Sequence, residues 1–149
     1  MLRLEQVDRH NFLAVINLSV SDEQKDFVAS NLYSLAQAYV QEECVPLALY
    51  EGDEPVGFAM YCLDSDEHEY WIYRLMIDKR YQGRGYGREA MRLLIDRIRA
   101  DADEDHRLVH ISFEPDNAIA KSLYESLGFV PDGRVEYGEV VYQLDLDAQ

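Results

Sequence analysis

Apolar and polar positions along the chain repeat with two periods, one typical of strands and the other typical of helices. Alternation near the start, and short apolar runs rich in β-branched and aromatic residues further on, predict strands. These strands are expected at residues 2–7, 45–50, 55–62, 70–78 and 107–113. The tail is predicted to form two more strands around a turn at Gly133 or Gly138.

Between these strands, apolar residues recur at the spacing of a helix face and predict helices. Residues 85–102 carry apolar positions on one helix face, namely Ala90, Met91, Leu94, Ile95 and Ile98. Near the N-terminus, a short helix precedes a second one that begins at a capping turn at Ser21 and continues to Tyr39. Asn117 is placed to cap a further helix that ends just before Gly128.

The predicted elements follow the order β-α-α-β-β-β-α-β-α-β-β, which favours an α/β (α+β) fold with a mixed sheet flanked by helices. No linker or repeat interrupts the 149 residues, so residues 1–149 are expected to form a single domain. The opening residues lack a secretory signal, and no apolar run reaches the roughly 20 residues of a membrane span. A cytoplasmic protein without a membrane partner is therefore expected.

Charge is distributed unevenly along the chain. The formal net charge is −15, which disfavours nucleic acid as a partner. Seven of the 14 basic residues lie between Lys79 and Arg99, where only Glu89 and Asp96 oppose them, so this segment carries +5 and the remainder −20. The basic segment suits one anionic ligand. The acidic remainder suits a cationic partner, with solubility alone as the alternative explanation.

The basic segment surrounds a glycine-rich loop between the strand at 70–78 and the helix at 85–102. Gly83, Gly85 and Gly87 let the backbone approach a ligand closely. The helix start supplies unpaired N–H groups and a partial positive charge, so this loop is predicted to bind phosphate. The GxxxxGK[ST] loop of nucleotide hydrolases is absent, and the glycine spacing does not fit the GxGxxG of dinucleotide folds.

Two motifs here resemble those of the GNAT superfamily of N-acetyltransferases. Arg80-x-x-Gly83-x-Gly85 matches the pattern (Gln/Arg)-x-x-Gly-x-(Gly/Ala) in the same strand–loop–helix setting. Downstream, the stretch from Asn117 to Phe129 resembles the pattern Asn-x-x-Ala-x-x-Leu-Tyr-x-x-x-Gly-Phe. The resemblance implies a mostly antiparallel mixed sheet, with a splay between its two central strands and about four flanking helices.

The resemblance also implies acetyl-CoA as the acetyl donor. The pyrophosphate would be held by the loop and helix start, at Gln82, Gly83, Arg84, Gly85, Tyr86, Gly87 and Arg88. The pantetheine arm would pair with the backbone of the preceding strand, at Leu75, Met76 and Ile77, much as an added strand does. A backbone N–H near Met76 would stabilise the oxyanion, and Asn117 would contact the cofactor near the pantetheine arm.

By the same resemblance, Tyr124 lies beside the thioester sulfur and protonates the leaving thiolate. The alternative is an amphipathic core tyrosine on its helix. The acceptor amine would attack the thioester directly, which agrees with the lack of a recognisable Cys/His nucleophile arrangement. Cys44 and Cys62 are expected to be core residues, and the four histidines lack metal-ligand spacing, so no metal is expected.

The acceptor is less well defined by the sequence. Residues 19–34 and 70–78 resemble bacterial spermine/spermidine (diamine) N-acetyltransferases, and a polyamine suits the acidic remainder. Such enzymes often carry a carboxylate in the middle of the strand before the loop, where this chain has Tyr73 and Arg74. Glu114 is the first candidate for base or substrate anchor, with an exposed loop carboxylate as the alternative. Asp22, Glu23 and Asp26 would lie in the roof of the acceptor site or simply cap a helix.

Two other functions stay open at this point. One is acetylation of protein N-termini or lysines, and the other is a CoA-binding module that regulates without catalysis. GNAT proteins often form dimers, so the resemblance also suggests a homodimer.

Overall fold

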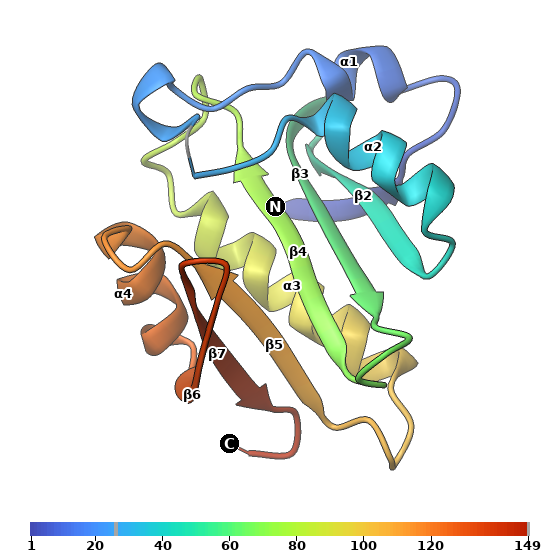
Figure 1. The fold of residues 1–149 in the computed structure, drawn as a ribbon. Coiled ribbons are helices and arrows are strands. Elements are labelled where there is room, and N and C mark those ends of the chain that lie inside the picture. Colours follow the sequence, from blue (N-terminus) through green and yellow to red (C-terminus); the bar gives the residue numbers. More distant parts are fainter. Residues whose placement is uncertain (26, 149) are drawn as a thin grey trace.

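The computed structural model describes residues 1–25 and 27–148. Its helices and strands follow the chain in the order β1 (Leu2–Gln6), α1 (Phe12–Ile16), the 3₁₀ helix η1 (Asp22–Gln24), α2 (Asn31–Val40), β2 (Cys44–Glu51), β3 (Glu54–Leu63), β4 (Tyr70–Ile77), α3 (Tyr86–Asp101), β5 (Leu108–Phe113), α4 (Ala118–Ser126), β6 (Val130–Glu136) and β7 (Glu139–Asp145). The seven strands form one sheet in the order β1-β2-β3-β4-β5-β7-β6 (Figure 1).

Every neighbouring pair of strands in this sheet is antiparallel except β4 and β5. That parallel pair is joined by the crossover helix α3, as parallel neighbours require. It is also short, because only residues 70–72 of β4 pair with residues 109–111 of β5. Beyond Ile72 the two strands diverge, so the splay expected between the central strands is present.

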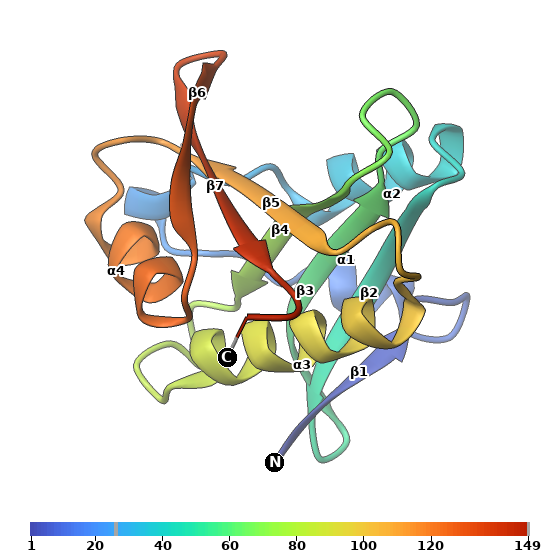
Figure 2. The ribbon, with the colours of Figure 1, turned by 90° about the horizontal axis from the view of Figure 1, so that it is seen from below.

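Helices cover both faces of the sheet (Figures 1 and 2). The apolar face of α3 is buried against one side, through Met91, Leu94 and Ile98. On the other side α1 packs over the sheet, where its Val15 joins a cluster with Phe58 and Met60. Two apolar layers on the two faces therefore hold the divergent strands from both sides.

The helix expected from Ser21 to Tyr39 is divided in the structure, so its predicted start was wrong. The segment at Ser21 forms only the three residues of η1, and the Ser21 side chain makes no cap hydrogen bond. Helix α2 begins ten residues after Ser21, at Asn31. There Ser30 Oγ accepts a hydrogen bond from the Tyr33 N–H at 3.1 Å and caps the helix.

Tertiary contacts decide between these two serines. The Asn31 side chain is buried and donates from Nδ2 to the Val15 carbonyl at 2.8 Å. That bond ties the first turn of α2 to α1. Two large apolar residues of α2, Leu32 and Tyr39, are exposed.

The tail forms the expected pair of strands, and Gly138 is the glycine at the turn between them. Tyr137 and Gly138 connect β6 to β7, with φ values of +52° and +80°. Gly133 lies within β6 instead, where the register shifts between Pro131 and Val135. Its φ of +93° marks it as part of a bulge.

Candidate active site

The glycine loop has the backbone geometry that a phosphate cradle needs. Gly83 and Gly85 have φ values of +81° and +78°, in the left-handed region that favours glycine, and Gly85 is the N-cap of α3. A Cβ added at either glycine would meet nothing within 4 Å, so the space over the loop is open. The first N–H groups of the long helix α3 lack intrahelical partners and lie at its positive end. The loop therefore fits a phosphate or pyrophosphate group.

A buried carboxylate fixes the start of this loop. Asp78 accepts hydrogen bonds from the backbone N–H of Ser19 at 3.0 Å and from Nε of Arg80 at 2.8 Å. Burial raises the pKa of Asp78, but these bonds outweigh it and hold the pKa below its ordinary value. Gln82 adds a second anchor, because its Nε2 donates to the Ile77 carbonyl at 2.9 Å and to Gln24 at 2.8 Å. The loop is thus held in place before any ligand binds.

Next to the loop, residues 73–77 of β4 have no strand partner on one edge within the described part of the chain. On its other edge β4 pairs with β3, where Leu75, Met76 and Ile77 lie opposite Ala59, Phe58 and Gly57. The pairing with β5 ends at Ile72. Backbone groups beyond that point are available to an extended ligand arm.

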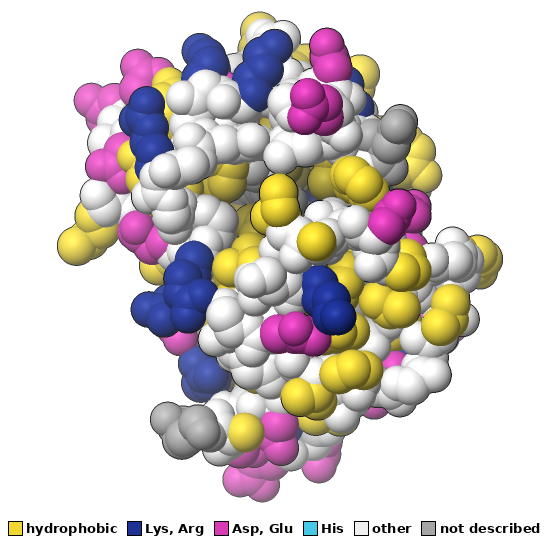
Figure 3. Space-filling view, turned by 90° about the vertical axis from the view of Figure 1, so that its left-hand side faces the viewer, with side chains coloured by type: hydrophobic (Ala, Val, Ile, Leu, Met, Phe, Trp, Pro, Cys, Tyr) yellow, Lys and Arg dark blue, Asp and Glu magenta, His cyan; other side chains and the backbone are white. Residues whose placement is uncertain are grey.

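The loop, the open edge of β4, β5 and α4 enclose a cleft of about 1150 Å³. Figure 3 faces the side of the molecule where the loop and α4 lie, and it shows a hollow with hydrophobic side chains around it and Lys and Arg side chains at the margins. Ten of the residues assigned to the site from sequence line this cleft: Leu75, Met76, Ile77, Gln82, Gly83, Gly85, Tyr86, Gly87, Asn117 and Tyr124.

Three residues assigned from sequence fall outside the lining. The Arg84 guanidinium lies over the ring of Tyr81 at 5.4 Å. Arg88 donates to Ser126 and so ties α3 to α4. Glu114 follows β5 and accepts through its carbonyl from the Asn117 N–H at 2.9 Å, which shapes the turn into α4. Their roles towards cofactor and substrate stay predictions.

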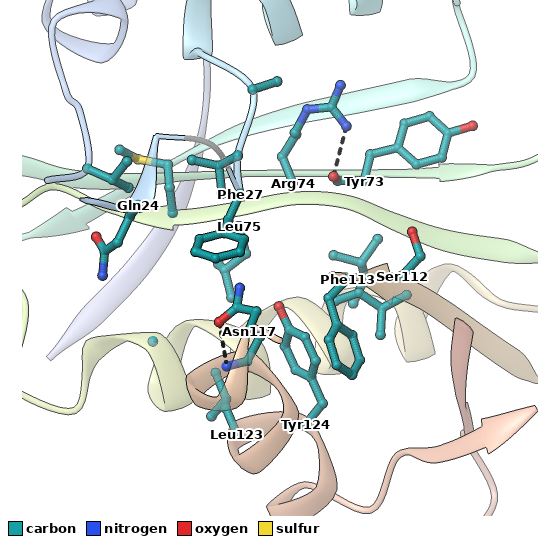
Figure 4. A pocket seen from close by; sticks show the side chains of 18 of the residues that line it. Gln24, Phe27, Tyr73, Arg74, Leu75, Ser112, Phe113, Asn117, Leu123 and Tyr124 are labelled. Atoms are coloured by element: carbon teal, nitrogen blue, oxygen red, sulfur yellow. Dashed lines mark hydrogen bonds between the residues drawn. The ribbon is translucent and has the colours of Figure 1, made fainter. Parts of the chain in front are cut away.

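Tyr124 brings a phenol into the middle of the cleft (Figure 4). Its ring packs against Phe113 and Phe129, with centroid separations of 5.4 and 5.9 Å. Burial disfavours the phenolate and raises the pKa of Tyr124 to about 12. The hydroxyl therefore keeps its proton at neutral pH. Asn117 lies beside it and caps α4, as expected, through a bond from the Ala120 N–H at 3.2 Å.

Arg74, one of the two residues found where the polyamine enzymes that this chain resembles often carry a carboxylate, turns towards α2 (Figure 4). Its Nε donates to Ser34 at 3.0 Å and its Nη2 to Gln37 at 2.8 Å, while Nη1 donates to the Tyr73 carbonyl at 2.9 Å. These bonds link β4 to α2 over the acceptor side of the cleft. Burial lowers the pKa of Arg74, although Arg remains charged at any pH of interest.

The end of the cleft away from the glycine loop is acidic. Four carboxylates line it, Asp64 and Glu67 between β3 and β4, and Glu136 and Glu139 at the tip of the β6–β7 hairpin. Ser112 donates to Oε1 of Glu139 at 2.7 Å. The sequence did not point to these four residues as part of the site. Glu136 and Glu139 reach the cleft only through the register of the β6–β7 hairpin. Placing the turn at Gly138 would have been the signal.

Two of the three acidic residues that would lie in the acceptor roof or simply cap a helix, Asp22 and Glu23, do not line the cleft. Asp22 is exposed and pairs with Lys25 at 3.0 Å, and Glu23 is exposed as well. Asp26 lies outside the residues that the structure describes. Gln24 and Phe27, from the same segment, line the cleft in their place.

His110 is the one buried histidine among the described residues. Its ring stacks on Trp71 at 5.2 Å, and Nδ1 lies 3.0 Å from the Glu69 carboxylate without hydrogen-bond geometry. No group of three or more His, Cys, Asp or Glu suited to a metal occurs in the described part of the chain. Within the same residues, no helix has the length and apolarity that crossing a membrane demands.

Solved structures share this architecture. Aminoglycoside acetyltransferase AAC(6′)-Ib, in complex with coenzyme A, superimposes with a TM-score of 0.78 at 17% identity, over 97% of this chain and 95% of that one. Spermidine N-acetyltransferase from Vibrio cholerae, in complex with CoA and spermine, gives 0.73 at 16% identity, over 95% and 92%. The expected fold, a mixed and mostly antiparallel sheet with flanking helices, is confirmed.

Sequence comparisons extend the likeness beyond the fold. Spermine/spermidine N(1)-acetyltransferase from Bacillus subtilis (strain 168) is 31% identical over 152 residues, which cover 97% of this chain and 99% of that protein. The model of the acetyltransferase (GNAT) family matches residues 12–129. With both motifs inside that match and the cleft built around them, the chain belongs to the acetyltransferase (GNAT) family.

Proposed function

We propose that this protein transfers the acetyl group of acetyl-CoA to a primary amine of a polyamine such as spermidine or spermine. One observation carries the proposal. A single cleft has a phosphate-binding loop at one end, a protonated phenol in its middle and four carboxylates at the other end. An anionic donor and a cationic acceptor can therefore enter from opposite ends.

The residues at the loop end fit coenzyme A. The open loop and the start of α3 would hold the pyrophosphate, and the unpaired edge of β4 at Leu75–Ile77 would hold the pantetheine arm. When bound, acetyl-CoA supplies the acetyl group as an activated thioester. A backbone N–H near Met76 would stabilise the oxyanion that develops there.

The reaction then requires two proton transfers, one from the acceptor ammonium and one to the leaving sulfur. An alkyl ammonium, with a pKa of roughly 10.4, must lose a proton before its nitrogen can attack. Tyr124 holds a proton on its hydroxyl and donates it to the leaving sulfur. Glu114 stays our sequence-based prediction for the base or anchor, although the structure places it outside the cleft lining.

The acidic end supports a polyamine as acceptor. An ammonium group is bound best by carboxylates in a partly dry cleft, where charge-assisted hydrogen bonds are strongest. The relationship to the Bacillus subtilis enzyme named for spermine and spermidine points to the same substrate class.

A panel of acceptors tests the proposal. Purified protein is mixed with acetyl-CoA and either spermidine, spermine, a monoamine or basic peptides, and CoA release is followed with a thiol reagent. We expect the largest kcat/KM with the polyamines, and mass spectrometry should find one added acetyl group on them. Preference for peptides would instead support acetylation of protein N-termini or lysines. Tight CoA binding without any release would support a regulatory module.

A further inference from the structure

The tip of the β6–β7 hairpin projects from the sheet beside the cleft (Figure 2). Three of its residues, Glu136, Tyr137 and Glu139, line the cleft. None of them belongs to the two sequence motifs that resemble the GNAT patterns. Their arrangement has a chemical consequence for the acceptor.

Glu136 and Glu139 lie directly opposite each other across the hairpin. Opposed residues of an antiparallel pair place their Cβ atoms about 4.5–5.5 Å apart on one face of the sheet. Two like charges at this separation repel each other, which destabilises the pair by roughly 0.2–1 kcal/mol. A cation bound between them removes that repulsion.

Glu136 and Glu139 differ in their charged neighbours. Arg134 lies 3.7 Å from Glu136, but its guanidinium makes shorter contacts of 2.8 Å to Glu67 and Asp132. Glu139 has no Lys or Arg partner within 4.0 Å among the described residues. Its Oε1 accepts from the Ser112 hydroxyl, which fixes the carboxylate, and Oε2 is free to accept another donor.

The turn that brings the two glutamates together is itself strained. Tyr137 adopts a φ of +52° and precedes Gly138 at +80°. Both central residues of this turn thus have positive φ, where Asn-Gly is the favoured pair and tyrosine is costly. The Tyr137 ring is fully exposed and lines the cleft. An aromatic ring and two carboxylates that line the same cleft can together surround an ammonium ion.

We infer that Glu139, with Glu136 and the ring of Tyr137, forms the subsite that binds an ammonium group of the acceptor. This inference rests on the proposed function, since it assigns the residues that select a cationic amine. Glu139 is the principal anchor, because Ser112 orients it and no described Lys or Arg lies within 4.0 Å of its carboxylate, while Arg74 interacts with it only at longer range. Tyr137 contacts the amine through its ring, and its strained backbone agrees with this role, because such strain clusters at ligand-binding positions.

The test compares Glu139→Gln with Glu104→Gln, the same chemical change at an exposed residue outside the cleft. For Glu139→Gln we expect KM for spermidine to rise by about ten-fold or more, the effect of losing a charge-assisted hydrogen bond. KM for acetyl-CoA should stay the same, and the midpoint of thermal unfolding should stay the same or rise slightly, because the variant loses the repulsion from Glu136. Glu104→Gln should leave all three unchanged.

A second variant separates binding from folding. Tyr137→Asn installs the preferred Asn-Gly turn, so thermal stability should be equal or higher while KM for spermidine rises by about three-fold or more. A purely structural role for Tyr137 predicts that the variant gains stability and keeps its KM. That result would contradict the assignment of the ring.

Direct titration distinguishes failure of this subsite from failure of the proposed function. Trp71, the single tryptophan of the chain, lines the cleft and reports spermidine binding to the CoA-loaded protein by fluorescence. If the wild type acetylates only peptides, the polyamine proposal fails, and the same KM comparison is made with the preferred peptide. If no acceptor is used, weaker spermidine binding by Glu139→Gln still supports the subsite. Equal binding by both proteins, or an unchanged acceptor KM, overturns it.

Discussion

Tyr124 is the residue on which the proposed chemistry depends most directly. Replacing it with phenylalanine removes the proton donor but keeps the ring that packs against Phe113 and Phe129. We expect turnover to fall by about ten-fold or more, within the usual range for a general acid, while the affinity for acetyl-CoA is constant. Steady-state kinetics with both substrates varied would measure this. Unchanged turnover would assign Tyr124 to the core instead.

The raised pKa of Tyr124 predicts how turnover depends on pH. Because burial stabilises the neutral phenol and raises its pKa to about 12, the proton stays on the hydroxyl up to alkaline pH. Wild-type kcat/KM should therefore rise with pH as the amine loses its proton, without a decline between roughly pH 9 and 10. A decline in that range, absent from Tyr124→Phe, would show that the phenol titrates near its ordinary value.

Asp78 carries a prediction about stability. Its pKa is lowered in the folded protein, so its carboxylate stabilises the fold above the unfolded-state value of 3.8, and that contribution disappears as the pH falls through the folded pKa. Asp78→Asn should cost about 1–3 kcal/mol at pH 7, since an amide cannot accept from both Arg80 and Ser19 as the carboxylate does. Thermal unfolding from pH 7 to pH 3 should show the two proteins converging. A difference independent of pH would contradict this.

At the scale of elements, two glycines near the start of α3 have different structural roles. Gly85 needs its φ of +78°, so Gly85→Ala should lower stability by about 1 kcal/mol. Gly87 is helical, and an added Cβ would meet only Leu123 Cδ2 at 3.9 Å, an ordinary contact. Gly87→Ala should therefore keep or raise the unfolding midpoint while KM for acetyl-CoA rises, because the methyl group occupies space at the cleft. An unchanged KM would show that the pyrophosphate does not approach α3 at this point.

Elements with strong local signals were predictable from the sequence. The apolar face of α3 and the Asn117 cap of α4 depend on nearby residues, and both are present as expected. The start of α2 was not predictable, because Ser21 and Ser30 carry the same capping signal and a buried contact of Asn31 decides between them. Local pattern determines the existence of an element more firmly than its boundary.

In the candidate site, too, the residues in local motifs were predictable and those that depend on tertiary structure were not. The loop and Tyr124 follow from contiguous motifs, so their positions in the cleft agree with the sequence-based expectation. Glu139 could not be found in this way. It reaches the cleft through the register of the β6–β7 hairpin, and a shift by one residue would turn its side chain to the other face.

At the scale of the whole molecule, the separation of charge predicts how salt affects the capture of the acceptor. A chain with a net charge of −15, a basic loop at one end of its cleft and four carboxylates at the other attracts a multiply charged amine before contact. With acetyl-CoA saturating, kcat/KM for spermidine should fall by about ten-fold between roughly 10 and 300 mM salt, as the screening length shortens to less than 10 Å. A monoamine carries a single charge, so its kcat/KM should fall much less, and its slope serves as the control for any effect of salt on the donor site. Equal slopes for the two amines would mean that the acidic end does not steer the acceptor, and the high net charge would then serve solubility alone.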